Sequence, residues 1–152
     1  MINSPQLPDK MKKYQGIATI LMRFTLATGF LSAVGSRLSL WGGHSSGWAS
    51  FLDYTKSVNS FAPVSLIPLL AILSTILETG FAILLLIGYK TRWASLGASI
   101  LTLFFALAMA NSFGLKEPLD YSVFAFSASA FLLSTMSCYP LSIDQKIEKI
   151  SG

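Results

Sequence analysis

Charged residues are scarce in this sequence. They make up 12% of its 152 residues, whereas hydrophobic residues make up 53%. A soluble domain carries roughly 25% charged residues, because it needs a charged surface to stay dispersed in water. This chain has too few charges to form such a surface. The scarcity of charge therefore argues against a soluble globular domain and favours a membrane protein.

Cysteine and histidine are almost absent. The chain has one cysteine, Cys138, and one histidine, His44. One thiol cannot close an internal disulfide or form a Cys-x-x-Cys redox pair, and these two residues are too few to build a zinc, haem or iron–sulfur site. The 11 basic residues outnumber the 7 acidic ones, but they are scattered, whereas nucleic-acid binding needs a basic patch. We expect no metal site, no cofactor site built by this chain alone and no nucleic-acid partner.

Long apolar runs, in contrast, fill more than half of the chain. Each has the length that a helix needs to cross about 30 Å of hydrocarbon, and a bilayer offers exposed backbone no water, so helix is the expected structure. The sequence predicts an all-α polytopic membrane protein, a single domain 1–152 folded as an antiparallel four-helix transmembrane bundle. The predicted spans are 14–34, 64–88, 93–113 and 121–139, with cytoplasmic tails 1–13 and 140–152.

Basic residues in short loops predict the orientation of such a bundle, because they stay on the cytoplasmic side. Seven of them fall on the side of the two termini: Lys10, Lys12, Lys13, Lys90, Arg92, Lys146 and Lys149. Three fall on the other side: Arg37, Lys56 and Lys116. We expect both termini in the cytoplasm and a bacterial inner membrane as the location. A cleaved signal peptide is a competing interpretation of the first run, but a charge at Arg23 is unusual in a signal core.

The connection between the first two spans carries an amphipathic pattern. Apolar residues such as Trp48, Phe51 and Val58 recur at three- and four-residue spacing, and polar residues such as Asp53 and Lys56 lie between them. The pattern predicts a short extracytoplasmic helix on the membrane surface or on the bundle. A structured loop whose aromatic side chains pack on the helix ends is the alternative.

Two charges interrupt the apolar runs, Arg23 in the first and Glu78 in the second. A charge at the centre of a span costs at least about 2.5–3.5 kcal/mol on insertion scales. Counted from the predicted cytoplasmic ends at Tyr14 and Gly88, both lie roughly 14–15 Å deep, which predicts an Arg23–Glu78 pair. The pair either fixes the register of two helices or forms, with Ser74 on the same helix face, a polar site for a quinone carbonyl, a proton or a polar headgroup.

A second group of polar residues falls near the predicted outer helix ends. Arg37 follows the first span, Asn111 ends the third and Asp120 precedes the fourth. Together they are candidates for an outer polar mouth of the bundle. Solvated loop ends are the alternative interpretation.

Several stretches resemble the DoxX family of small four-helix membrane proteins. The first is Arg23-Phe24-Thr25-Leu26-Ala27, and Val34-Gly35-Ser36-Arg37-Leu38 follows where the first span ends. The most specific is Glu78-Thr79-Gly80-Phe81 with the later turn Gly88-Tyr89-Lys90-Thr91-Arg92. Many members have a histidine where this chain has Ala33 or Val34, so a role carried by that histidine does not transfer.

The resemblance implies a four-helix fold but several functions, since some members resemble a subunit of thiosulfate:quinone oxidoreductase and others look like membrane partners of redox enzymes. Fold alone does not fix function. Three hypotheses follow: a redox-associated subunit that interacts with quinone or a partner oxidoreductase, a non-enzymatic anchor or assembly module for a soluble enzyme, and a small transporter or proton path. Any enzymatic activity would be that of a quinone-linked oxidoreductase subunit. The expected surroundings are the lipid bilayer, a redox partner and, through outward-facing small residues, a second copy of the chain.

Overall fold

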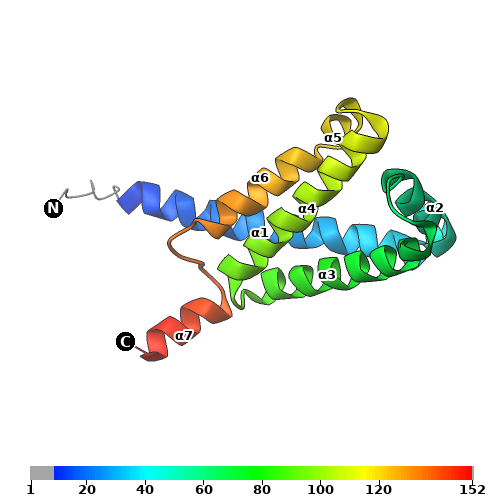
Figure 1. Ribbon diagram of the computed structural model, residues 1–152. Coiled ribbons are helices and arrows are strands. Elements are labelled where there is room, and N and C mark those ends of the chain that lie inside the picture. Colours follow the sequence, from blue (N-terminus) through cyan, green and yellow to red (C-terminus); the bar gives the residue numbers. More distant parts are fainter. Residues whose placement is uncertain (1–8, 152) are drawn as a thin grey trace.

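The computed structural model describes residues 9–151, and over these residues the protein is all-helical (Figure 1). Two short 3-10 helices, η1 (Gly42–His44) and η2 (Val64–Leu66), connect the longer elements. The α-helices are α1 (Asp9–Arg37), α2 (Gly47–Val58), α3 (Ile67–Ile87), α4 (Thr91–Phe113), α5 (Lys116–Asp120), α6 (Val123–Ser134) and α7 (Ile143–Ser151). The predictions made for residues 1–8 lie outside the described residues.

Three segments are long and apolar enough to cross a membrane: Lys10–Arg37, Val64–Ile87 and Thr91–Phe113. Their outer faces carry large apolar side chains such as Leu21, Ile76 and Phe104, each more than 60% exposed. That is the arrangement that lipid requires, because lipid and not water covers these faces. The structure therefore confirms a membrane helical bundle. Helices α1, α3 and α4 lie close to the ranges predicted for the first three spans.

The fourth predicted span, 121–139, is not one continuous helix. Helix α6 has 12 residues and ends at Ser134. Side chains then bind the carbonyl oxygens that a further helical turn would have used: Thr135 Oγ1 donates to Leu132 O at 2.7 Å, and Tyr139 Oη donates to Leu133 O at 3.1 Å. Because these side chains donate to the carbonyl oxygens, the helix can end at Ser134 without leaving these two carbonyl groups unsatisfied.

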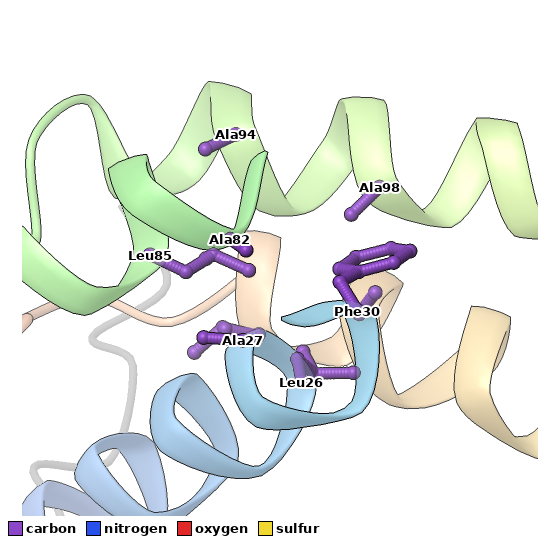
Figure 2. Close-up of a cluster of buried hydrophobic side chains, with 9 residues drawn as sticks. Leu26, Ala27, Phe30, Ala82, Leu85, Ala94 and Ala98 are labelled. Atoms are coloured by element: carbon purple, nitrogen blue, oxygen red, sulfur yellow. The ribbon is translucent and has the colours of Figure 1, made fainter. Parts of the chain in front are cut away.

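Small residues bring the helices together, as membrane packing requires. α1 packs on α3, and α4 packs on α6. Figure 2 shows Ala27 of α1, Ala82 of α3 and Ala98 of α4 meeting in one apolar cluster with Leu26, Leu85 and Phe30. A hydrogen bond joins α4 to α6, because Ser127 Oγ of α6 donates to Ser99 O of α4 at 2.9 Å. Small residues of α4 are buried, among them Ala94, Ser95, Ala98 and Ser99.

The turn between α3 and α4 holds the C-terminal segment. Gly88 has φ of +68°, and a Cβ there would lie 2.4 Å from Arg23 Nη2 and 2.4 Å from Ser142 Cβ, so no larger residue fits. The Asp144 carboxylate accepts from Lys90 N at 2.7 Å and Thr91 N at 2.8 Å and so caps the start of α4. The two ends of the bundle thus differ: one carries this turn and the start of α7, and the other carries α2 (Figure 1).

Helix α2 occupies the loop in which an amphipathic helix was predicted. It runs from Gly47 to Val58, buries Thr55 and Val58, and packs against α3 and α4. It therefore lies on the bundle, across the end opposite to the α3–α4 turn (Figure 1). This position makes α2 one wall of the site described next.

Candidate functional site

An ion pair is buried between α1 and α3. Arg37 Nη2 donates to Glu78 Oε1 at 2.9 Å, and the exposed fractions of the two side chains are 12% and 2%. Arg37 Nη1 also donates to Thr75 Oγ1 at 3.3 Å. The Phe51 ring of α2 lies 3.9 Å from the guanidinium carbon, within the range of a cation–π contact. Three helices therefore hold this one guanidinium.

The direction of helical side chains explains this pairing. Cα–Cβ bonds tilt toward the N-terminus of their own helix, and long side chains follow that tilt. On two antiparallel helices, Arg37 at the end of α1 therefore reaches back into the bundle, while Glu78 in the middle of α3 reaches toward the α2 end. The two side chains approach each other although their positions were not predicted to be level.

The predicted Arg23–Glu78 pair is not formed. Arg23 also points toward the start of α1, which carries it away from Glu78 and toward the end of α3. Its contacts on α3 are with residues 85 and 86, and seven residues of helix separate Glu78 from Leu85, about 10 Å. The estimate of equal depth failed because it set Tyr14 level with Gly88, whereas α1 continues well past the α3–α4 turn (Figure 1).

Arg23 is nevertheless fully buried, with an exposed fraction of 1%. It donates only to backbone carbonyls: to Leu85 O at 3.0 Å and Leu86 O at 3.2 Å on α3, and to Pro140 O at 2.8 Å and Leu141 O at 3.3 Å beyond α6. A helix leaves its last carbonyls without intrahelical partners, and a cation is favourable at that end. Arg23 therefore joins α1, α3 and the C-terminal segment, and four of its five N–H donors are used by backbone carbonyls.

A cavity of about 390 Å³ lies beside Arg37, between α2, α3 and α4. Its lining is mostly apolar, with Leu70, Leu73 and Leu77 from α3 and Leu101, Phe104 and Phe105 from α4. Leu73, Leu77 and Phe104 are also exposed on the outside of the bundle. The cavity therefore opens between α3 and α4 on the face that lipid covers. Its volume falls in the range of small-molecule sites.

Polar groups gather at the α2 side of this cavity, where Arg37, Tyr54, Thr55 and Asn59 line it. Thr55 and Asn59 bond to backbone carbonyls of α2, whereas the Tyr54 hydroxyl bonds to nothing among residues 9–151 and its ring stacks on Phe113. Burial, together with the negative charge of Glu117, raises the pKa of Tyr54 above its ordinary value. Tyr54 therefore keeps its proton at neutral pH and remains a hydrogen-bond donor.

The other predicted site residues separate into two groups. Ser74 lines the cavity, but its hydroxyl donates to Ala71 O at 3.0 Å. Asn111 and Asp120 are exposed and are not part of the cavity wall, and Asp120 pairs with Lys116 one turn away. Of the predicted outer mouth, only Arg37 belongs to the site, where it joins Glu78 and Ser74.

Sequence reasoning missed the contribution of α2 to this site. Phe51 was interpreted as part of the apolar face of an amphipathic helix, and Tyr54 was not singled out. No motif marks either residue as ligand-binding. The one usable signal was Arg37 itself, because an arginine at the end of an antiparallel helix reaches inward toward a buried acid on its neighbour. A buried carboxylate needs a partner. Arg37 is the partner of Glu78 Oε1, whereas Glu78 Oε2 has no hydrogen-bond partner in the described part of the chain.

The fold and the site define a class: an integral membrane helical bundle with an ion pair buried beside an apolar cavity that faces lipid. The DoxX family model matches residues 18–111, which is more than half of the chain. The protein belongs to the DoxX family. The matched range includes Arg23, Arg37, Ser74 and Glu78, whereas α5, α6 and α7 lie beyond it. No curated protein and no solved structure matches the chain.

Proposed function

We propose that this DoxX-family membrane protein is a redox-associated subunit that binds a quinone in the cavity between α2, α3 and α4. The observation that carries the proposal is the combination of an apolar, lipid-facing cavity with one guanidinium in its wall. Ligand sites commonly combine apolar walls with a few placed polar groups. A quinone has the matching parts, an apolar ring and tail and two carbonyl acceptors.

Arg37 is the donor in this proposal. The guanidinium has five N–H donors, and the bonds to Glu78 and Thr75 occupy only some of them. Arg23 cannot take this role, because backbone carbonyls bind it on two sides. Tyr54 offers a second donor on the same side of the cavity. The quinone ring would lie against these donors, with its tail leaving toward the bilayer between Leu77 and Phe104.

Reduction of a quinone to a quinol takes two electrons and two protons. The described residues contain no group of three or more histidine, cysteine or acidic residues that could hold a redox metal. We therefore place the electron source in a partner oxidoreductase, and the role of this chain is to hold the quinone in the membrane. The proposed location is a bacterial inner membrane with both termini in the cytoplasm.

Filling the cavity tests the proposal. Ala108 lines the cavity, and its neighbour Leu107 on α4 is exposed on the outer face and does not. We expect Ala108→Phe to weaken binding of a decyl-benzoquinone at least tenfold in lipid nanodiscs, because the new ring occupies the ligand volume, and Leu107→Phe to leave binding unchanged. Equal affinities in both variants and the original protein would contradict the proposal.

The anchor hypothesis predicts a different outcome of the same experiment. If the protein only anchors a soluble enzyme, no variant binds the quinone, and deletion of this protein releases the enzyme from the membrane fraction. A transporter would instead carry solute across liposomes that contain this protein alone.

A further inference from the structure

The charge of the cavity wall is balanced by a residue that does not itself line the cavity. Arg37 lines it, and Glu78 lies behind Arg37 at 2.9 Å. Within residues 9–151, Arg37 is the charged side chain that bonds to Glu78, and Glu78 Oε2 has no hydrogen-bond partner. The pair is formally neutral, so the ligand meets a donor group without a net positive charge.

This neutrality matters because the pair is buried. An arginine alone would favour an anionic headgroup, through a charge-assisted bond to a carboxylate, sulfonate or phosphate. With Glu78 in place, an anion bound to Arg37 would lie close to a second negative charge in a region of low dielectric, where like charges repel strongly. A neutral carbonyl accepts the same hydrogen bond and meets no such repulsion.

We propose that Glu78 sets the charge selectivity of the cavity, so that the site takes neutral, tailed carbonyl compounds and rejects anionic amphiphiles such as fatty acids and phospholipids of net negative charge. This inference rests on the proposed function, because it concerns the ligand of the same cavity. It assigns Glu78 a specificity role through Arg37. A bare arginine in this wall would admit any anionic lipid of the surrounding membrane.

The test compares two probes with tails of the same length in phosphatidylcholine nanodiscs: decyl-benzoquinone, which is neutral, and decyl sulfonate, which stays ionised. The original protein is expected to bind the quinone and to bind the sulfonate at least tenfold more weakly, about 1.4 kcal/mol. Glu78→Gln keeps the shape of the side chain and removes its charge, and it is expected to bind the sulfonate at least tenfold more tightly than the original protein.

Two further variants complete the charge comparison. Arg37→Gln combined with Glu78→Gln makes the wall neutral again and is expected to lose the gain in sulfonate affinity. Asp120→Asn removes a carboxylate charge at an exposed position outside the cavity wall, and it is expected to keep the original preference. The double variant also shows whether an effect of Glu78→Gln comes from charge or from a change in fold.

The outcomes separate this inference from the proposed function. If the original protein binds the quinone and Glu78→Gln gains no affinity for the sulfonate, the selectivity role of Glu78 is wrong and the quinone site stands. If the original protein binds the sulfonate as tightly as the quinone, the selectivity role is also wrong. If it binds neither probe, the proposed function itself fails.

Discussion

Two arginines on α1 carry different tasks, and their bonding partners distinguish them. Arg23 donates to four backbone carbonyls of α3 and the C-terminal segment, so it holds structure. Arg37 donates to two side chains and lines the cavity, so it faces the ligand space. In the sequence, Arg23 lies within the predicted first span and Arg37 just after it, and only their positions relative to α3 assign these tasks.

Removing Arg37 should destabilise the protein. Arg37→Leu leaves the Glu78 carboxylate buried without its partner, and breaking a buried ion pair in this way costs about 3–5 kcal/mol. Replacing both residues by leucine should restore much of that loss. Thermal unfolding in detergent measures the effect, with Arg92→Leu as the matched control, since Arg92 is exposed at the start of α4. An Arg37→Leu protein as stable as the control would show that Glu78 does not depend on this pair.

At the scale of whole elements, the C-terminal segment is tied to the α3–α4 turn. Arg23 binds Pro140 O and Leu141 O, and Asp144 N donates to Gly88 O at 3.0 Å. Non-helical backbone at membrane depth is tolerated only where protein or water satisfies it. These bonds are the means by which the segment after α6 can remain non-helical beside the spanning helices.

The cap formed by Asp144 can be tested by amide exchange. Asp144→Ala removes the acceptors of Lys90 N–H and Thr91 N–H, and loss of an N-cap side chain costs about 1 kcal/mol. We expect hydrogen exchange at these two amides to become about fivefold faster. Asp120→Ala, at an exposed acid near the other end of the bundle, is the control. Unchanged exchange at Thr91 in Asp144→Ala would contradict the capping role.

Elements were more predictable from the sequence than the contacts between them. The three long spans follow from runs of apolar residues that only lipid can cover, and α2 follows from the spacing of Phe51 and Val58. The end of α6 was not predictable, because it depends on Tyr139 folding back onto Leu133 O. Hydropathy alone continues that helix to Tyr139.

The site was predictable only in part. Glu78 was identified because a charge within an apolar run needs an explanation, Ser74 because it shares a helix face with Glu78, and Arg37 because it follows the first span. The partner of Glu78 was not, since pairing depends on where α1 ends relative to α3 and on the direction of each side chain. The cavity wall from α2 was not predictable either, because an amphipathic helix leaves open which surface its apolar face covers.

At the scale of the whole molecule, the two ends of the bundle differ in packing: one end is filled by protein contacts, and the other contains the cavity. At the α3–α4 turn, Arg23, Gly88 and Asp144 fill the interior with protein contacts. At the α2 end, Arg37 and Tyr54 border the cavity that opens to lipid. The proposed orientation puts the closed end in the cytoplasm and the ligand site on the outer half of the membrane.

Photolabelling tests the central claim, that a quinone occupies this cavity, most directly. A benzoquinone with a decyl tail and a photoreactive azide on the ring is bound to the protein in nanodiscs and activated, and the labelled residues are identified by mass spectrometry. The account predicts labels on cavity-lining residues, such as Tyr54 of α2 and Phe105 and Ala108 of α4, which excess unlabelled quinone removes. Labels confined to outer-face residues such as Leu107 and Trp93, or labels that excess quinone does not reduce, would contradict it.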